Sequence, residues 1–294
     1  MLKSFIKSDG HRPGAAIFLS GSGSNAERLL ESLTAASSWM PLVLVTDRPD
    51  TSRARELAVR FDLPLAALDI GEFYRRHGEP RVSLQTENGR RIRDAWTDEL
   101  RRLLVPYAVD FGILAGFVPL SNITSDFPCL NIHPGDLTYL KDGQRFLVGL
   151  HQVPLERALT ENLSILRSSV IVAQPYTGQG GEMDSGPLLG ISGPVPTCWE
   201  GHTRDEIAAV IAARPMQRPS GGYGDLAARL AALNLERLKQ SGDWVVFPLV
   251  VEEFAQGNYA LDEQEKLWYR REGQWQQVIT VEFDVQGGKR LVLQ

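Results

Sequence analysis

Apolar and polar positions follow two alternating spacing patterns along the first half of the chain. Short apolar runs are typical of buried strands. They recur between segments whose apolar residues are spaced three and four apart, as on one face of a helix. The predicted strands are 15–20, 42–47, 64–68, 111–117, 130–132 and 168–174, and the predicted helices are 26–33, 53–61 and 90–104. This order predicts an α/β fold in which helices cover both faces of a mostly parallel central sheet.

The pattern changes toward the carboxyl terminus. Residues 266–283 (KLWYRREGQWQQVITVEF) alternate aromatic or branched side chains with polar ones, as half-buried strands do. We therefore expect a main domain at residues 1–257 and a small β-rich appendage at residues 258–294, arranged as a three-stranded meander. Stability, dimerisation, covering of the main domain and substrate contact remain open as roles for this appendage.

Composition and charge narrow the class of protein. A formal net charge of −5 disfavours a general nucleic-acid binder, which needs a basic face. The two cysteines are too few for a disulfide framework and lack metal-ligand spacing. The first ten residues lack the apolar core of a signal peptide, and no apolar run is long enough to span a bilayer. We expect a soluble cytoplasmic protein that binds no metal, nucleic acid or membrane.

The segment Asn131-Ile132-His133-Pro134 carries the strongest candidate chemistry. Side chains two residues apart on a strand point to the same face, so the Asn131 amide lies beside the His133 imidazole. Together with a carboxylate such as Asp184, they can pass a carbonyl carbon through a tetrahedral intermediate. From these residues alone, a structural histidine and a turn-forming aspartate explain the pattern equally well.

A glycine-rich turn, Ser20-Gly21-Ser22-Gly23-Ser24-Asn25, lies between a predicted strand and a predicted helix. Backbone N–H groups and the positive helix end attract anions there, and glycine allows close approach of a phosphate. Ser24 or Asn25 could also cap the helix, which does not exclude phosphate binding. The turn matches neither the G-x-G-x-x-G fingerprint nor a P-loop. This disfavours a nucleotide-dependent oxidoreductase that uses Asp47 as its acidic residue.

Five motifs occur in a defined order: SGSGSN (20–25), AGF (115–117), NIHP (131–134), DSGPLL (184–189) and FPLVVEEFAQG (247–257). This order resembles the folate-dependent formyltransferase family, which includes glycinamide ribonucleotide formyltransferase. The resemblance implies a Rossmann-like formyltransferase fold, with residues 1–257 as the catalytic domain. It also implies transfer of a formyl group from 10-formyltetrahydrofolate to an amine. The amine would belong to a small phosphorylated or sugar-containing substrate, such as glycinamide ribonucleotide in purine biosynthesis.

The resemblance also assigns roles to individual residues. It implies that Asn131 and a protonated His133 donate hydrogen bonds to the developing oxyanion, while Asp184 keeps His133 charged. The implied contacts are Gly21, Ser22, Gly23, Ser24 and Asn25 for the substrate phosphate, Phe117, Val118, Leu120, Gly181 and Met183 for the folate, and His151 and Asp243 for the substrate amine.

The chain departs from the family at several positions, and other functions remain open. Pro119 stands where the family usually has a basic residue, and Asp136 brings a charge next to the NIHP motif. The expected partners are a reduced folate and a small-molecule amine, with a homodimer as an open alternative. A non-catalytic ligand-binding protein of the same fold is one competing function. A formyltetrahydrofolate hydrolase is another, although such hydrolases usually have an extra domain where this chain has residues 1–14.

Overall fold

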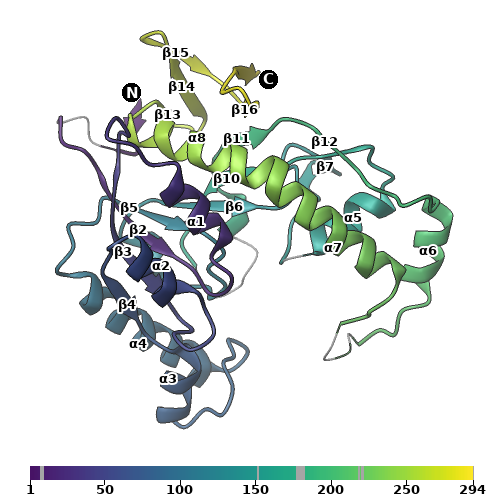
Figure 1. The fold of residues 1–294 in the computed structure, drawn as a ribbon, viewed down its shortest axis with the longest axis horizontal. Helices are drawn as coiled ribbons and strands as arrows, with labels where there is room; N and C mark the ends of the chain where they lie inside the picture. Colours follow the sequence, from purple (N-terminus) through teal and green to yellow (C-terminus); the bar gives the residue numbers. More distant parts are fainter. Residues whose placement is uncertain (7–9, 151, 177–182, 218, 220–221, 294) are drawn as a thin grey trace. The chain divides into compact units, whose positions relative to one another are not determined.

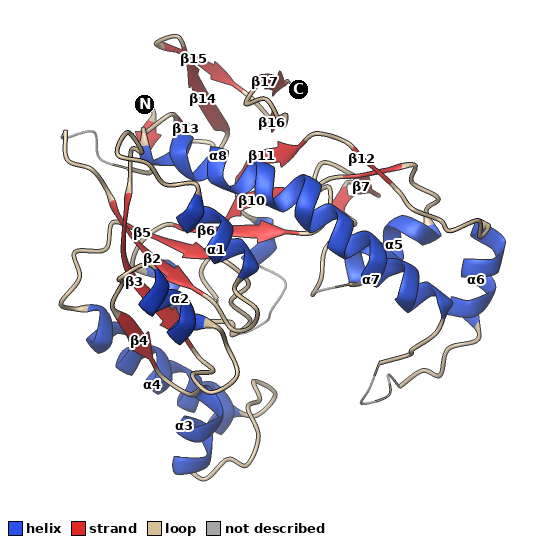
Figure 2. Ribbon diagram, viewed as in Figure 1, coloured by secondary structure: helices blue, strands red, loops and turns tan. Residues whose placement is uncertain are grey.

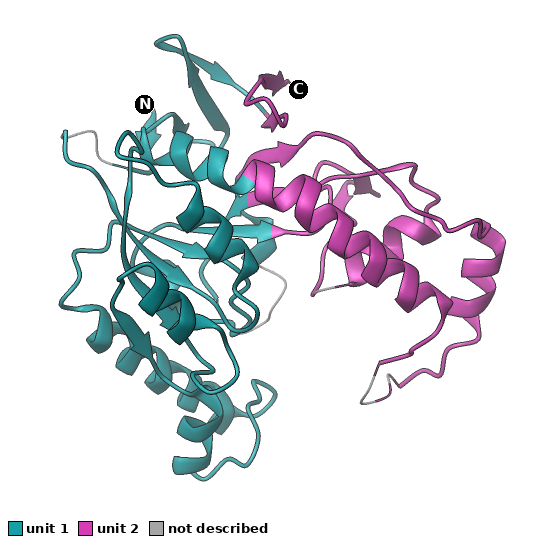
Figure 3. Cartoon of the chain, viewed as in Figure 1, with its two compact units in different colours: residues 1–132, 171–187, 247–278 teal, residues 133–170, 188–246, 279–294 magenta. Residues whose placement is uncertain are grey.

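The computed structural model describes residues 1–6, 10–150, 152–176, 183–217, 219 and 222–293. The chain divides into two compact units, which Figure 3 colours separately. Unit 1 comprises residues 1–132, 171–187 and 247–278, and unit 2 comprises residues 133–170, 188–246 and 279–294. Strands and helices alternate along much of the chain (Figure 1), so the predicted α/β class is confirmed.

Unit 1 contains five parallel strands in the spatial order β6-β5-β2-β3-β4. Their bounds are β2 (Gly14–Phe18), β3 (Met40–Thr46), β4 (Leu65–Ala67), β5 (Phe111–Leu114) and β6 (Cys129–His133). Every residue of β2 and β5 is buried, as expected for short apolar strands in a sheet covered on both faces. The last residue of β6, His133, is counted in unit 2.

Helices of unit 1 connect these strands and cover the sheet. They are α1 (Ser24–Glu31), α2 (Ala54–Arg60), α3 (Ile70–Arg76) and α4 (Glu87–Leu104). In Figure 2, α1 and α2 lie in front of the strands. Helix α4 starts where the Thr86 side chain accepts a hydrogen bond from the Gly89 N–H, and it buries Ile92, Trp96 and Leu100 as its apolar spacing predicts.

Unit 2 contains further strands. Strand β10 (Ser169–Val172) has residues in both units, and unit 2 adds β11 (Leu188–Ser192), β16 (Thr280–Phe283) and β17 (Lys289–Val292). The full strand order is β17-β16-β11-β10-β6-β5-β2-β3-β4. Strands β11 and β16 are parallel, whereas β17 pairs antiparallel with β16. The prediction of a mostly parallel central sheet is therefore confirmed.

Helices of unit 2 pack around a second apolar cluster, which includes Leu155, Ile207 and Leu230. These helices are α5 (Val153–Thr160), α6 (Arg204–Ala212) and α7 (Leu226–Leu238). The unit also contains two short antiparallel strand pairs, formed by β7 (Leu140–Lys141) with β8 (Gln144–Arg145) and by β9 (Ile165–Leu166) with β12 (Val195–Pro196).

The carboxyl-terminal segment follows α8 (Trp244–Ala255). Its first strands are β13 (Tyr259–Leu261), β14 (Leu267–Arg271) and β15 (Gln274–Gln277), which form an antiparallel sheet together with β1 (Lys3–Ser4). The meander expected here is present in β13–β15, whereas β16 and β17 join the central sheet instead. The domain boundary between residues 257 and 258 stays a prediction.

Candidate functional site

The parallel strands of unit 1 bring several polar segments to one edge of their sheet. Strand β2 leads into the glycine turn, β3 into Asp47, and β5 into residues 115–120, while Asn131 lies near the end of β6. Because these strands are parallel, their carboxyl ends meet at the same edge, and ligands of open α/β sheets bind beside such an edge.

Asn131 and Asp184 come together in unit 1 although they are far apart in sequence. The Asn131 Nδ2 atom donates a long hydrogen bond of 3.5 Å to the Asp184 Oδ1 atom. Asp184 lies in the short 3₁₀ helix Met183–Ser185. Backbone bonds from Gln174 N–H to Met183 O (3.2 Å) and from Val172 N–H to Pro187 O (3.0 Å) hold this helix against the chain that leaves β10.

His133 lies two residues beyond Asn131 on β6 and is 3% exposed. Its Nε2 atom is 2.7 Å from the carbonyl oxygen of Leu147, within unit 2. Asp184 belongs to unit 1, so the expected pairing of Asp184 with His133 stays a prediction.

The glycine turn leads directly into α1. Gly23 is the N-cap residue with φ 63°, and no side chain caps the helix. The alternative in which Ser24 or Asn25 caps α1 is therefore wrong. A Cβ atom at Gly23 would lie 2.8 Å from side-chain atoms of both Leu19 and Leu57, so this position requires glycine in both conformation and space.

Arg53, the residue before α2, binds the glycine turn. Its N–H donates to Gly21 O at 3.0 Å, and its Nη1 donates to Ser22 O at 3.3 Å. The guanidinium also makes two hydrogen bonds to Glu27, which lies in the first turn of α1. These hydrogen bonds lower the pKa of Glu27. The sequence motifs give no signal for Arg53, because it lies outside all five of them.

Asp47 is the second polar residue at this edge. It is 1% exposed, and neither carboxylate oxygen has a hydrogen-bond partner in the part of the chain that the structure describes. The nearest cation, the Nε atom of Arg48, lies 3.6 Å from Oδ2. Burial raises the pKa of Asp47. An acid at a strand end was visible in the sequence, but its burial was not.

Two described residues of the implied folate site, Phe117 and Met183, pack against the apolar core of unit 1. Phe117 contacts Phe18 edge-on, with ring centroids 5.3 Å apart, and Met183 packs against the same core. The Val118 N–H donates to the Ser20 hydroxyl at 2.9 Å, and Leu120 O accepts from Arg93 Nη1. These bonds fix the loop after β5.

Three other predicted positions stay predictions. Gly181 and His151 lie outside the described residues. Asp243 is buried in unit 2 at the end of a π-helical turn, Lys239–Asp243, and its Oδ1 atom accepts a hydrogen bond of 2.5 Å from the Ser168 hydroxyl. An amine that binds Asp243 must share this carboxylate with Ser168, so the expected contact stays a prediction.

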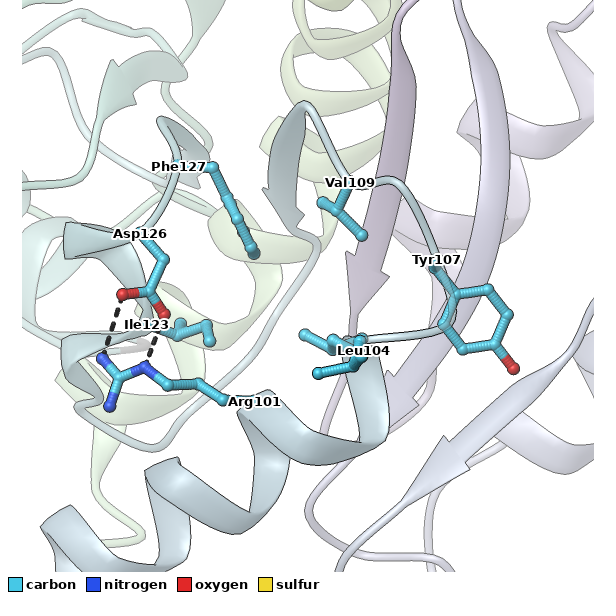
Figure 4. Close-up of a pocket in the computed structure, with 8 residues that line it drawn as sticks. Arg101, Leu104, Tyr107, Val109, Ile123, Asp126 and Phe127 are labelled. Atoms are coloured by element: carbon cyan, nitrogen blue, oxygen red, sulfur yellow. Dashed lines mark hydrogen bonds and ion pairs between the residues drawn. The ribbon is translucent and has the colours of Figure 1, made fainter.

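A cavity of about 270 Å³ lies at the other end of β5 and β6. Figure 4 shows apolar side chains on its walls and the Arg101–Asp126 ion pair at its edge, where Arg101 Nε is 2.6 Å from Asp126 Oδ2. Its lining residues are Arg101, Leu104, Val105, Tyr107, Val109, Ile123, Asp126 and Phe127. Because Val109 and Phe127 precede these strands, the cavity is separate from the candidate site at the carboxyl ends.

The described residues contain neither a candidate membrane span nor a candidate metal site. None of their helices is both long and apolar enough to cross a membrane. Within the same residues, no three His, Cys, Asp or Glu side chains are grouped so that they could hold a metal ion.

No protein-family model and no curated protein matches this chain. Solved structures do. The phosphoribosylglycinamide formyltransferase of Coxiella burnetii is 16% identical and covers 90% of this chain and 96% of its own, with a TM-score of 0.57. The corresponding enzyme of Anaplasma phagocytophilum is 18% identical and covers 93% and 99%, with a TM-score of 0.57. Glycinamide ribonucleotide transformylase 1 from Symbiobacterium toebii is 20% identical and covers 87% and 93%, with a TM-score of 0.53.

The chain has the formyltransferase fold. The likeness extends over nearly the whole length of the chain and of these enzymes, at identities of 16–20% that show the fold alone. The Rossmann-like formyltransferase fold implied by the motif order is therefore confirmed. Reaction and substrate do not follow from a fold, and they rest on the site itself.

Proposed function

We propose that this protein transfers a formyl group from 10-formyltetrahydrofolate to the amine of a small phosphorylated or sugar-containing substrate. The observation that carries the proposal is the contact between Asn131 and Asp184 at the carboxyl edge of a formyltransferase-type sheet. A fold alone does not need an amide and a carboxylate from distant segments at this edge, whereas acyl transfer needs donors and a charge at one place.

In the proposed reaction, the amine nitrogen attacks the formyl carbon, and negative charge develops on the former carbonyl oxygen. The Asn131 amide and the imidazolium of His133 donate hydrogen bonds to this oxygen. The Asp184 carboxylate favours the charged imidazole. A proton then moves from the attacking amine to the departing folate nitrogen, with a water molecule as relay. Loss of one oxyanion donor typically costs about 100- to 1,000-fold in rate.

The glycine turn supports a phosphate-bearing amine. Gly21 and Ser22 are exposed, α1 begins at Ser24 without a capping side chain, and helix N-termini of this kind bind anions. Glycinamide ribonucleotide fits this description, as do other phosphorylated or sugar-linked amines. Asp136 next to the NIHP motif and the Asp243–Ser168 bond favour an amine acceptor whose polar groups differ from those of glycinamide ribonucleotide.

The first test is calorimetric titration with a stable 10-formyltetrahydrofolate analogue, followed by transfer assays with a panel of phosphorylated amines. Tetrahydrofolate and formate are measured together, because transfer releases no formate and hydrolysis releases it stoichiometrically. We expect micromolar folate binding and transfer at least 100-fold slower in Asp184→Asn. Asp94→Asn, an exposed position on α4, is the matched control. Absence of folate binding at high protein concentration would overturn the proposal.

A further inference from the structure

Arg157 holds the segment that follows the β7–β8 hairpin. Its Nη1 atom, from helix α5, donates to the carbonyl oxygens of Phe146 at 2.7 Å and Val148 at 3.0 Å. The carbonyl between them, that of Leu147, takes a different partner, the His133 Nε2 atom at 2.7 Å. One side chain therefore fixes the peptide groups on both sides of the carbonyl that contacts His133.

Gly135 provides the space for this contact. A Cβ atom at Gly135 would lie 2.5 Å from Leu147 O and 3.1 Å from His133 Nε2. The backbone around Gly135 is itself fixed, because its carbonyl accepts from the Ser169 hydroxyl at 2.7 Å. A residue with a side chain at position 135 would push the Leu147 carbonyl away from the imidazole.

A carbonyl oxygen can only accept a hydrogen bond, so Nε2 must carry a proton at this contact. The proton on one imidazole nitrogen defines the role of the other, because neutral histidine has one donor and one acceptor nitrogen. We infer that Arg157 and Gly135 are positioning residues that fix His133 as the Nε2–H tautomer, with Nδ1 as the nitrogen that gains and loses a proton.

The consequence for formyl transfer rests on the proposed function. With Nε2 held by Leu147, the nitrogen of His133 that donates to the developing oxyanion is Nδ1. The Leu147 carbonyl accepts from Nε2–H in both the neutral and the charged imidazole, so the ring keeps its orientation while Nδ1 changes its proton. Arg157 thus acts on the reaction through Leu147 and His133, without contact to the reacting atoms.

The test is NMR of the full chain with ¹⁵N-labelled histidine, in which two-bond correlations distinguish the tautomers. The signals that disappear in the His133→Asn variant are those of His133, which distinguishes them from the signals of the other histidines among the five in the chain. We expect neutral His133 with its proton on Nε2 in the wild type. In Arg157→Met and Gly135→Ala, the ratio of the Nδ1–H to the Nε2–H tautomer should rise roughly 2- to 12-fold, the range that corresponds to one hydrogen bond. Arg229→Met, exposed on α7, is the matched control and should leave the ratio unchanged.

A wild-type protein with the proton on Nδ1 would overturn the inference, even if the variants fail to fold. An unchanged tautomer ratio in a folded Arg157→Met variant would overturn the assignment to Arg157. The tautomer measurement needs no substrate, so failure of folate binding removes the proposed function and leaves this result standing. Where transfer is measurable, Arg157→Met should lower kcat while KM for the folate stays unchanged.

Discussion

Replacement of Arg53 by methionine tests how the glycine turn is held. Arg53 reaches Ser22 O with Nη1 and makes two hydrogen bonds to Glu27, and its own N–H binds Gly21 O. Methionine keeps much of the apolar side chain and removes all five guanidinium donors, while the backbone bond to Gly21 remains. The variant therefore removes the contacts to Ser22 and Glu27, together with the exposed ion pair to Glu56.

The expected size of the effect follows from these contacts. One lost hydrogen bond to Ser22 O is worth about 0.5–1.5 kcal/mol. The half-exposed ion pair with Glu27 adds about 0.2–1 kcal/mol. Together they predict a loss of about 1–2 kcal/mol in the free energy of unfolding. The variant also takes a positive charge from beside the turn and leaves Glu27 paired with Arg60, so we expect the dissociation constant of an anion on the turn to rise about 5- to 30-fold.

The assay is calorimetric titration of the phosphorylated amine, or of inorganic phosphate if the amine is unknown, at low ionic strength. Arg60→Met is the matched control, because Arg60 pairs with Glu27 and Glu31 and makes no hydrogen bond to the turn among the described residues. We expect this control to weaken binding less than Arg53→Met does. Equal losses in both variants would show that charge alone matters, and unchanged affinity in Arg53→Met would refute the reasoning.

The effect on stability should depend on pH. The hydrogen bonds from Arg53 lower the pKa of Glu27 in the folded protein. A carboxylate with a lowered folded pKa stabilises the fold above its unfolded pKa of about 4.3, and this contribution is lost as the pH falls through the folded pKa. The gap in unfolding free energy between wild type and Arg53→Met should therefore narrow below about pH 4.

Three further variants test other parts of unit 1. Asp47→Asn removes an acid whose pKa burial raises. The stability that this acid contributes is present below about pH 4 and is lost as the pH rises through its raised folded-state pKa. Thermal melts should therefore show the variant to be more stable than wild type at pH 7 and similarly stable at pH 3. An equal gap at both values would contradict this. Asn131→Asp should lower kcat about 100-fold or more with an unchanged circular dichroism spectrum, and full activity would exclude Asn131 as an oxyanion donor. Gly186→Ala places a Cβ atom 1.9 Å from Val172 O, so chemical denaturation should show a loss of about 1–3 kcal/mol or more, against almost none for Gly21→Ala, whose Cβ meets no atom within 4 Å.

The buried strands could be predicted because their apolar runs end at polar or turn residues. Strand β5 illustrates both the success and its limit. The run 111–117 predicts a strand throughout, but β5 ends at Leu114 because Gly116 takes φ 85° and turns the chain. Apolar composition alone does not distinguish the last residues of a strand from a buried turn.

The partners of the carboxyl-terminal strands could not be predicted. The alternation of apolar and polar side chains in residues 266–283 predicts strands, and β14 and β15 form in this segment. It does not show which edge a strand joins, because backbone hydrogen bonding is the same on any edge. Strand β16 leaves the antiparallel sheet and pairs parallel with β11, which only the tertiary structure reveals.

The same limit applies to the candidate site. Motif order placed Asn131 and Asp184 together, and the structure shows them in contact. The partner of His133 Nε2 is a backbone carbonyl in an irregular segment, and no side-chain pattern encodes where a carbonyl points. Arg53 and Arg157 could not be predicted for a related reason, since each binds backbone oxygens of a segment outside its own helix.

The pairing of β16 with β11 has a consequence for synthesis of the chain. Strand β11 ends at Ser192, and its outer neighbour β16 ends at Phe283, so 91 further residues (283 minus 192) must be made before that edge is covered. At about 5–20 residues per second, the interval is roughly 5–20 s. During this time the apolar strand β11 has an open edge, and open edges recruit other chains. The nascent protein should therefore depend on chaperones that bind exposed strands until β16 has been made and pairs with β11.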